Sequence, residues 1–373
     1  MAKKIAIVGS GNAGCVSALN LNFLKNAEDH NQIGEIDLYH DPSVPIERVG
    51  QGSLPNLSKC LFEALDMNWY DRNLIQATPK TGIVYENWGK TNHDFIHDFS
   101  GGEVVIHYVP KLLQEQTLQS GFFNVIEKKI TDPESEIDAD YIIDCRGRPT
   151  LDDSYETLTN PINSVILARK EGRDYDLTYT RCVATPNGWT FVIPNMDSVS
   201  YGYLYNNTIT TKEEATADFV ERFDVEPDGD LTFNNYIAKD LWVGERTILN
   251  GNRYSFVEPL EATSTSIYLD ISESFYDVLI GEQDKEESNE YINDYVRKVQ
   301  DFILWHYKNG SKFDTPFWDY AKTLSYYDKD DLEERVNYCR ELNKFATVGR
   351  PDLRYGQWGP YSLMCWYNNV GGV

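Results

Sequence analysis

The feature that most constrains the fold lies within the first fourteen residues. An apolar run, Lys3–Val8, ends in the sequence GSGNAG, which is a GxGxxG pattern. Apolar residues at helical spacing follow over 16–23, and a second apolar run covers 35–39. Strand, glycine turn, helix and strand in this order predict a βαβ unit whose glycines let the backbone approach a pyrophosphate. We interpret these residues as a dinucleotide site, with a glycine turn that merely packs a helix on a sheet as the alternative. The proposed contacts are Gly9, Gly11, Asn12, Ala13 and Gly14.

The residue that would meet the adenosine ribose is ambiguous. Asp41 is the acidic residue after the second apolar run, but it lies farther from the glycines than the usual ~20 residues. A long helix, or a loop around residues 26–34, would account for the excess. His40 competes for the same position, so His40 and Asp41 both stay candidates for cofactor contact.

The charge balance argues against several classes of partner. The 373 residues include 34 basic and 59 acidic side chains, for a formal net charge of −25. Such a field repels phosphate backbones and anionic lipid, so we expect no nucleic-acid partner and no membrane association. The six cysteines are scattered without a CxxC pair, as in a reduced cytoplasmic protein. We therefore expect a cytoplasmic protein without a metal site, and a homo-oligomer is left open.

Alternating and helical patterns predict the remaining elements. They indicate an α/β fold in which a Rossmann-like nucleotide-binding part lies beside an antiparallel β sheet. Further strands are expected at 122–130 and 139–147 and within the β-rich stretch 163–207, and helices at 107–118, 284–307 and 332–342.

Five segments resemble, in their order, the motifs of one enzyme family. The segments are 48–55 (RVGQGSLP), 78–88 (TPKTGIVYENW), 188–194 (GWTFVIP), 256–264 (FVEPLEATS) and 302–307 (FILWHY). Together they resemble the flavin-dependent halogenases, whose best-known members chlorinate or brominate tryptophan. The resemblance runs from the N-terminal glycines to about Trp318, which is most of the chain. It departs at Phe191, where the family pattern Trp-x-Trp-x-Ile-Pro has its second tryptophan.

The resemblance implies a FAD-binding module of the flavin monooxygenase and halogenase type over residues 1–275. A β-rich substrate-side insertion would occupy about 155–240, and a short C-terminal helical and aromatic region 276–373. The implied reactants are reduced FAD (FADH2), O2 and a halide ion, and a separate flavin reductase is implied because no second nicotinamide-binding βαβ unit is visible. The resemblance also assigns FAD contacts to Gly50, Gln51, Gly52, Ser53 and Asn250.

Four residues would carry the chemistry by resemblance. Lys80 would direct hypohalous acid at the substrate, as a hydrogen-bond donor or as a haloamine, and Glu261 would polarise it or act as general base. Thr263 and Ser264 would offer backbone N–H groups to the halide at a helix start. The plain alternatives are a solvated surface lysine and a helix-capping pair. We assign Glu258, three residues before Glu261, a structural role.

Residues of the third matched segment would form an aromatic wall between flavin and substrate. The wall consists of Trp189, Phe191, Ile193 and Pro194. Ordinary core packing is the alternative for the two aromatic residues, and we expect His306 and Tyr307 to be helix-packing residues. The rival functions are an aromatic monooxygenase, which Phe191 slightly favours, and a non-catalytic flavin-binding protein. Aromatic hydroxylases carry Gly-Asp near the ribityl chain, where this chain has Asn-Gly-Asn at 250–252.

The end of the chain sets the expectation for substrate. The stretch 355–367 is rich in glycine and aromatic residues and is unlike a helical cover. We therefore expect an open site that accepts small electron-rich aromatics such as indoles and phenols. Chloride, bromide and iodide all remain candidates for the halide. The compact, acidic chain resembles a phage-type or marine-type member of the family.

Overall fold

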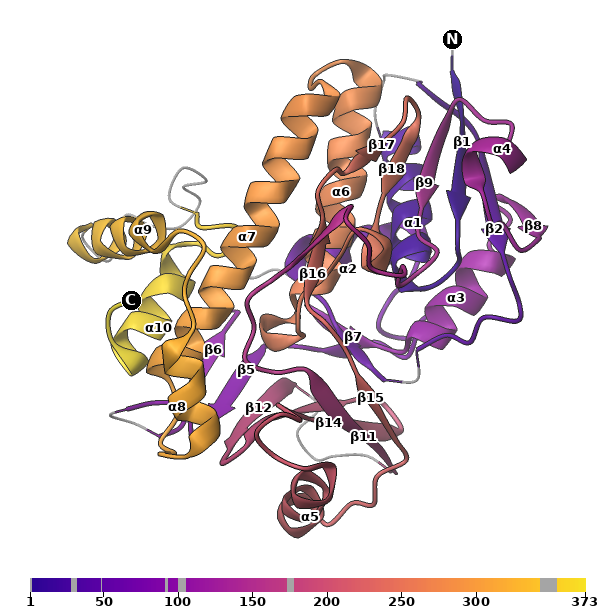
Figure 1. Ribbon diagram of the computed structural model, residues 1–373. Coiled ribbons are helices and arrows are strands. Elements are labelled where there is room, and N and C mark those ends of the chain that lie inside the picture. The colour runs from indigo at the N-terminus through magenta and orange to yellow at the C-terminus, as the bar shows by residue number, and fades with distance from the viewer. Residues whose placement is uncertain are drawn as a thin grey trace.

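A parallel sheet at the N-terminal end confirms the predicted βαβ unit (Figure 1). The computed structural model describes residues 2–27, 32–47, 49–90, 93–99, 105–172, 178–342 and 354–373. Strand β1 (Lys3–Val8) leads into helix α1 (Asn12–Ala27) and pairs in parallel with β2 (Ile33–His40) on one side and β9 (Tyr141–Asp144) on the other. The expected return strand therefore lies directly beside β1. Beyond these strands the sheet continues with β8 (Asn124–Glu127), β18 (Thr247–Leu249) and β17 (Trp242–Val243).

Glycine is required at two positions of the first turn. Gly9 has φ 103°, a left-handed conformation, and a Cβ atom there would lie 2.6 Å from the Cys145 carbonyl oxygen. A Cβ atom at Gly14 would lie 1.8 Å from the Gly9 carbonyl oxygen. The chain can therefore turn from β1 into α1 and pack beside β9 only without side chains at these points.

A seven-stranded sheet forms the second layer. Its strands are antiparallel except for β5 and β12, which run parallel. Strands from residues 82–98 join strands from 164–232, so the sheet combines two separate stretches of the chain. Helix α5 (Lys212–Phe223) packs on it at the bottom of Figure 1. In sheet order the strands are β15 (Gly229–Thr232), β11 (Ser164–Glu171), β14 (Ser198–Tyr205), β13 (Gly188–Pro194), β12 (Tyr179–Thr185), β5 (Gly82–Glu86) and β6 (Phe95–Asp98).

Short elements connect the two large sheets. One three-stranded sheet carries Lys80 at its end, and a second one leads into the turn that carries Glu261. The first consists of β3 (Gln51–Gly52), β7 (Ile106–Tyr108) and β4 (Thr78–Pro79), and the second of β10 (Tyr155–Thr157), β16 (Tyr236–Ala238) and β19 (Ser255–Phe256). The short helices are α2 (Pro55–Ala64), α3 (Pro110–Gln119), α4 (Pro133–Glu136), η1 (Gly251–Arg253) and η2 (Leu260–Ala262).

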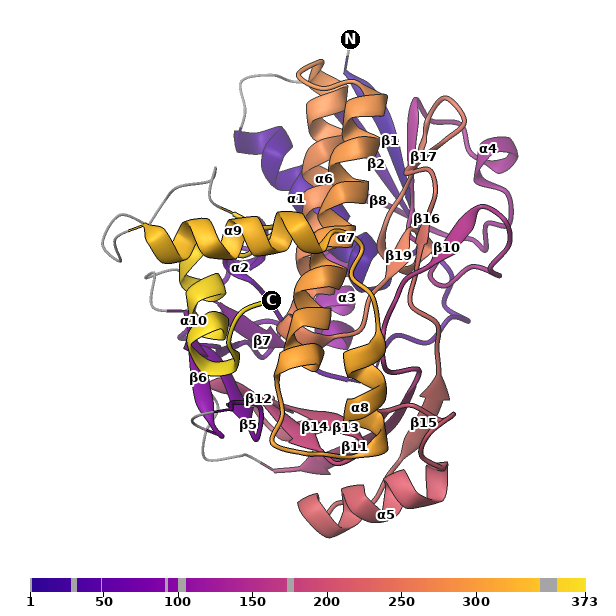
Figure 2. The same cartoon turned by 60° about the vertical axis from the view of Figure 1, so that its left-hand side comes forward.

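Helices cover the remaining side of the molecule. Helices α6 and α7 lie side by side, and in Figure 1 the last three helices lie on the side of α7 away from β1. Figure 2, turned by 60°, shows α9 crossing near α7 and α10 beside β6. The helices are α6 (Thr263–Ile280), α7 (Lys285–Asn309), α8 (Pro316–Thr323), α9 (Lys329–Glu341) and α10 (Pro360–Val370).

Two expectations about helices are wrong. The stretch 355–367 was expected not to be helical, but α10 begins at Pro360 and buries Leu363, Trp366 and Val370. Its aromatic side chains are therefore buried on one face of a helix. The helix expected over 107–118 begins only at Pro110, because His107 pairs within the short sheet as part of β7. The helices expected over 284–307 and 332–342 are confirmed as α7 and α9, within a few residues.

Two further observations concern the chain as a whole. Among the described residues no helix combines the length and the apolar character that a membrane crossing requires. Within the same residues no three His, Cys, Asp or Glu side chains gather as metal ligands would. All six cysteines are free thiols, and five of them are buried.

Candidate functional site

A strained turn positions Glu261. The backbone of Glu261 has φ 69° and ψ 8°, and that of Ala262 has φ 56° and ψ 38°. Two consecutive non-glycine residues in the left-handed region cost free energy, and such strain concentrates at functional sites. The turn directs Glu261 into the interior, and helix α6 begins immediately afterwards at Thr263.

Four side-chain donors surround the Glu261 carboxylate, which is 2% exposed. Its Oε1 accepts hydrogen bonds from the Tyr85 hydroxyl at 2.5 Å, from Nε1 of Trp366 at 3.0 Å and from Nε2 of His306 at 3.1 Å. Its Oε2 accepts one from Nε1 of Trp358 at 3.4 Å. These donors come from β5, α7 and the C-terminal segment, so the carboxylate joins distant parts of the chain.

The pKa of Glu261 follows from its neighbours. Burial by itself would raise the pKa, but His97 and His306 lower it well below its usual value. Nδ1 of His97 lies 3.4 Å from Oε2 of Glu261, and the His97 side chain is 3% exposed. The carboxylate is therefore ionised at neutral pH, although it is removed from solvent.

Lys80 is buried at the end of β4, which contradicts the surface alternative. Its side chain is 2% exposed, and Nζ donates a hydrogen bond to the Ser53 carbonyl oxygen at 3.3 Å. Nζ also lies 5.2 Å from the centre of the Phe99 ring. Burial lowers the pKa of Lys80 to about 8, and the charge of Glu261 opposes that shift. The amine can therefore exist in both protonation states near neutral pH.

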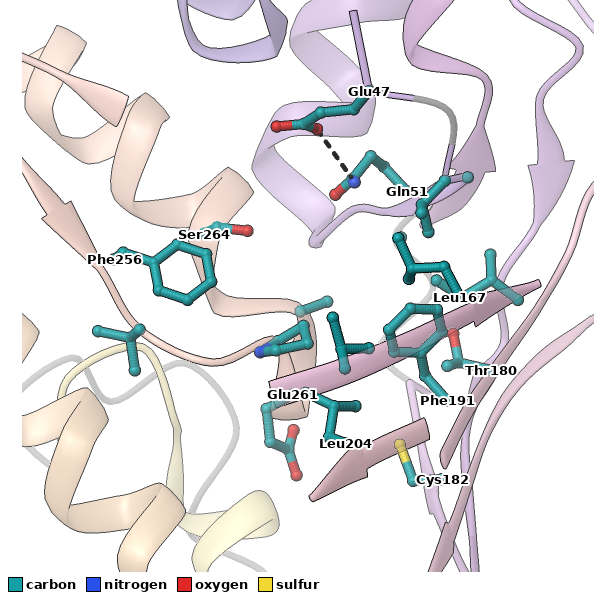
Figure 3. Close-up of a pocket in the computed structure, with 18 of the residues that line it drawn as sticks. Glu47, Gln51, Leu167, Thr180, Cys182, Phe191, Leu204, Phe256, Glu261 and Ser264 are labelled. Carbon is teal, nitrogen blue, oxygen red and sulfur yellow. Dashed lines mark hydrogen bonds between the residues drawn. The ribbon is translucent and has the colours of Figure 1, made fainter. Parts of the chain in front are cut away.

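Glu261 borders two cavities. The first has a volume of about 370 Å³, and Lys80, Glu261 and the aromatic pair Trp189 and Phe191 line it. Figure 3 shows Phe256 and Ser264 on one side of this cavity and Leu167 and Phe191 on the other. The second has a volume of about 490 Å³ and contains His97, Phe99 and Trp358 in its lining. Among the described lining residues, Glu261 alone borders both cavities.

The predicted wall residues differ in position. Trp189, Phe191 and Ile193 line the first cavity, whereas Pro194 does not, and its carbonyl oxygen accepts a hydrogen bond from Thr78 at 3.4 Å. Phe191 lies over Gly202, where a Cβ atom would come within 2.1 Å of the ring. The ring is therefore fixed against β14.

The residues predicted to hold the halide lie at the start of α6. Ser264 lines the first cavity. Thr263 is fully buried, and its Oγ1 has no hydrogen-bond partner among the described residues. The first backbone N–H groups of a helix lack intrahelical partners and carry the positive end of its dipole, which favours an anion.

The predicted cofactor residues fall into two groups. Gly50, Gln51 and Gly52 line the first cavity, whereas Ser53 is fully buried beside it and bonds to Ser58 at 2.6 Å. Gln51 also contacts Glu47 at 3.4 Å, as drawn in Figure 3.

The second group lies around the glycine turn. Nδ1 of His40 lies 2.6 Å from Oγ of Ser10, whereas Asp41 bonds to Ser43 on the surface. Of the two ribose candidates, His40 is therefore the one that contacts the glycine turn. The side-chain oxygen of Asn12 accepts a hydrogen bond from the Tyr108 hydroxyl at 2.8 Å.

Asn250, which the resemblance assigns to the flavin, lies in the core between α1 and α6. It is fully buried, and its amide donates to Ser17 at 2.9 Å and to the carbonyl oxygen of Tyr268 at 3.0 Å. Its own Oδ1 accepts a hydrogen bond from the Gly251 backbone. Asn250 therefore joins α1 to α6.

The residues present fit a flavin dinucleotide. A Cβ atom built at Gly11 would meet nothing within 4 Å, so the turn before α1 is open to an approaching group. The first N–H groups of α1 are available there to a pyrophosphate. The first cavity is largely apolar and aromatic, as a flat ring system requires, and its volume is within the range of cofactor sites.

Glu258 has the structural environment that we expected. Its Oε2 accepts hydrogen bonds from the Tyr307 hydroxyl at 3.0 Å and from Nε1 of Trp189 at 3.1 Å. Oε1 has no partner among the described residues. Burial raises the pKa of Glu258 to about 8, and these hydrogen bonds offset the shift only in part. The neutral acid therefore fixes the indole of Trp189 in the wall.

We expect Glu258→Gln to flatten the dependence of stability on pH. The folded protein holds a proton on Glu258 that the unfolded chain releases, so the free energy of unfolding should fall as pH rises from about 4.5 to about 8. The amide of glutamine retains a hydrogen-bond acceptor and does not titrate. The variant should therefore not lose unfolding free energy as pH rises. Urea unfolding across this range measures the effect, with the exposed Glu221→Gln as control. An unchanged slope in E258Q would contradict the assignment.

Several site residues were not identified from the sequence. Tyr85 lies in the matched segment 78–88, and His306 lies in the matched segment 302–307. The resemblance nevertheless assigned neither residue a role in the site. His306 and Tyr307 are buried as packing residues, but each also bonds to one of the two glutamates. Nothing local marks Trp358 and Trp366, because only folding brings them to Glu261.

The arrangement of the two sheets is the fold of solved flavin-dependent halogenases. BrvH, a flavin-dependent halogenase from Brevundimonas sp. BAL3, superposes with a TM-score of 0.78 at 19% identity, covering 100% of this chain and 90% of that chain. The tryptophan 6-halogenase SttH from Streptomyces toxytricini gives a TM-score of 0.77 at 20% identity, covering 99% and 91%. At these identities the likeness is one of fold.

Sequence comparison defines the family. The family model described as tryptophan halogenase matches residues 4–117 and 111–350, so this chain belongs to the tryptophan halogenase family. The tryptophan 7-halogenase RebH of Lentzea aerocolonigenes is 26% identical over 300 residues, which are 74% of this chain and 55% of that protein. The chain spans about half the length of the curated relatives it matches.

Proposed function

We propose that this protein is a flavin-dependent halogenase that uses reduced FAD, O2 and a halide to halogenate an electron-rich aromatic substrate. The observation that carries the proposal is a pair of buried charged groups: Lys80, which lines the first cavity, and Glu261, which borders both cavities. An ionised carboxylate and a low-pKa amine are costly to bury. A pure flavin-binding protein would have no use for them.

The first cavity would hold the flavin ring. Gly50, Gln51 and Gly52 border it, and the open turn at Gly11 would take the pyrophosphate. When bound, reduced FAD would give two electrons to O2, and the oxidant so formed would take two more from the halide, which yields hypohalous acid and water. The first turn of α6, at Thr263 and Ser264, would hold the halide through backbone N–H groups.

Lys80 would act from the first cavity, close to Phe99 of the second, and Glu261 would act between the two cavities. Protonated Nζ of Lys80 would donate a hydrogen bond to hypohalous acid and so make its halogen more electrophilic. Oε2 of Glu261, which has fewer bonded donors than Oε1, would accept the proton that the aromatic ring releases. Trp189 and Phe191 would exclude the substrate from the flavin cavity, which favours halogenation over direct oxygen transfer.

The remaining features of the proposal follow from the family. The substrate would be a small indole or phenol bound in the second cavity, and chloride, bromide or iodide would serve as halide. A separate flavin reductase would supply reduced FAD in the cytoplasm. The division into a core at 1–275, an insertion at about 155–240 and a C-terminal region at 276–373 is part of the same proposal.

Product masses test the proposal. The purified protein is supplied with reduced FAD by a reductase, with O2, with an indole and with chloride, bromide or iodide in turn. We expect a product that carries the halogen, recognised for bromide by its isotope doublet, and none without halide. A product that gains one oxygen atom instead would identify a monooxygenase. Halide-independent flavin oxidation without any product would identify a flavin-binding protein.

A further inference from the structure

His306 lies on α7 next to Glu261, and each of its two ring nitrogens has one partner. Nδ1 lies 2.6 Å from the carbonyl oxygen of Phe302, one turn earlier in the helix. Nε2 lies 3.1 Å from Oε1 of Glu261, and both side chains of this contact are buried. A carbonyl oxygen can only accept a hydrogen bond, so Nδ1 of His306 must carry a hydrogen atom.

A further proton must lie between His306 and Glu261. A neutral imidazole with its hydrogen on Nδ1 has a lone pair at Nε2, and this lone pair would face a carboxylate oxygen at hydrogen-bond distance. The contact therefore needs one more proton, either on the ring or on the carboxyl group. The Tyr85 hydroxyl and the indoles of Trp358 and Trp366 also donate to this carboxyl group, which favours its ionised form. The proton therefore belongs on His306, which makes the ring an imidazolium.

The surroundings of the ring suit a positive charge. The centroid of the Trp366 ring lies 3.3 Å from that of His306, and the centroid of the Phe302 ring lies 4.7 Å away. Aromatic rings at such distances attract a cation. Burial lowers the pKa of His306, whereas the hydrogen bond and the charge of Glu261 and the Phe302 carbonyl raise it. The buried imidazolium is tolerated because the carboxylate beside it makes the pair neutral as a whole.

Other titratable side chains face this pair from the neighbouring elements. They are Lys80, Tyr85, His97, Cys182 and Cys365. Burial raises the pKa of the tyrosine and of both cysteines, so these groups are uncharged at neutral pH. The lysine and the other histidine are cations when protonated, so they act on Glu261 in the same direction as His306. Nδ1 of His97 is the more distant of the two histidine contacts, at 3.4 Å from Oε2.

We propose that His306 is a positioning residue for the proton acceptor: as an imidazolium it keeps Glu261 ionised and holds Oε1, which leaves Oε2 to take the proton of the aromatic ring. In that step the C–H bond at the halogenated carbon breaks, its electron pair restores the aromatic ring, and the proton moves to Oε2. The neutral acid beside an imidazolium leaves one uncompensated positive charge, which favours release of the proton to solvent through the second cavity. The proton transfer rests on the proposed function, whereas the charge on His306 does not.

The charge on His306 can be measured in the protein without flavin or halide. Nitrogen-15 NMR of histidine-labelled protein shows whether one ring nitrogen or both carry hydrogen. We expect His306, assigned by the loss of its signals in His306→Gln, to be protonated on both nitrogens at pH 7 and to titrate about one pH unit or more above the unperturbed value of about 6.5. In Glu261→Gln the ring should be neutral at pH 7, because burial then acts without a compensating charge. A neutral His306 ring in the wild-type protein at pH 7 would overturn the proposal.

The kinetics of His306→Gln test the effect on the reaction. The glutamine amide can donate to Oε1 in place of Nε2 but carries no charge, so the pKa of Glu261 should rise and its carboxylate should be protonated at low pH. For an indole substrate we expect kcat to fall about tenfold or more from pH 8 to pH 6 in H306Q but not in the wild type, with KM within about twofold. His107→Gln is the matched control, since His107 is equally buried but contacts Thr78 and Thr180 instead of a carboxylate. An unchanged profile in H306Q, or an equal change in both variants, would show a packing role and overturn the proposal.

The two measurements separate this inference from the proposed function. An imidazolium at His306 in a protein that forms no halogenated product would support the charge assignment and count against the halogenase. Halogenation by a protein whose His306 ring is neutral at pH 7 would overturn the inference and leave the halogenase assignment intact.

Discussion

Replacing Lys80 with methionine is expected to lower halogenation of an aromatic substrate by about a hundredfold to a thousandfold, the range measured for loss of one transition-state donor. Methionine retains most of the side-chain length and removes the amine. Formation of hypohalous acid, measured with a small diffusible trap, should continue, because Lys80 is assigned to the later step. Simultaneous loss of trapped hypohalous acid would contradict that assignment.

The same variant should remain folded. The amine of Lys80 has only the Ser53 carbonyl oxygen as a hydrogen-bond acceptor among the described residues, so its burial is a cost that K80M removes. We expect the free energy of unfolding to stay equal or to rise. Urea unfolding of both proteins checks that an inactive variant is not simply an unfolded one.

The pH profile separates the two roles considered for Lys80. With a pKa of about 8, a protonated donor is lost as pH rises through that value, whereas a haloamine-forming neutral amine is gained. We expect the yield of halogenated product, divided by the yield of trapped hypohalous acid, to fall above about pH 8. A rise instead would identify the neutral amine as the reacting form.

Glu261→Gln is the second large effect that we expect. The substitution removes the proton acceptor, which should lower kcat by about a hundredfold to ten-thousandfold. It also points an amide at side chains that are themselves donors, including Tyr85, Trp366 and His306. Steady-state kinetics with a saturating indole substrate measure the first effect.

Glu261 should also differ from Glu258 in stability. Glu261→Ala leaves several buried donors without an acceptor, so we expect a loss of about 3–5 kcal/mol in the free energy of unfolding. Glu258→Ala is the matched comparison, because Glu258 is equally buried, lies three residues earlier and has a raised pKa instead of a lowered one. Equal activity losses in E261Q and E258Q would contradict the distinction between the two glutamates.

Much of the fold could be predicted from local sequence. The turn from β1 into α1 is recognisable because its glycines are required by backbone contacts within a few residues and by the neighbouring strand β9. Helix α7 is recognisable from the spacing of its apolar residues. The prediction failed where a short strand runs directly into a helix. His107 was included in the predicted helix, but it pairs in a sheet, and the helix begins only at Pro110.

The candidate site was less predictable. Lys80 and Glu261 were found through motif resemblance, but their burial and their opposite pKa shifts depend on groups far away in the chain. The resemblance assigned Asn250 to the flavin, but its hydrogen bonds to Ser17 and Tyr268 could be known only from the structure. Spacing alone cannot distinguish a side chain that points into a cavity from one that points into the core.

The sequence by itself determined the βαβ unit, the family resemblance and the residues proposed to carry the chemistry, because those signals lie within short stretches of chain. The tertiary structure decided that Glu261 borders two cavities, and that Trp358 and Trp366 of the C-terminal segment bond to its carboxylate. The physical reason is that burial, hydrogen bonding and the charge of a cavity arise only from contacts between residues distant in sequence.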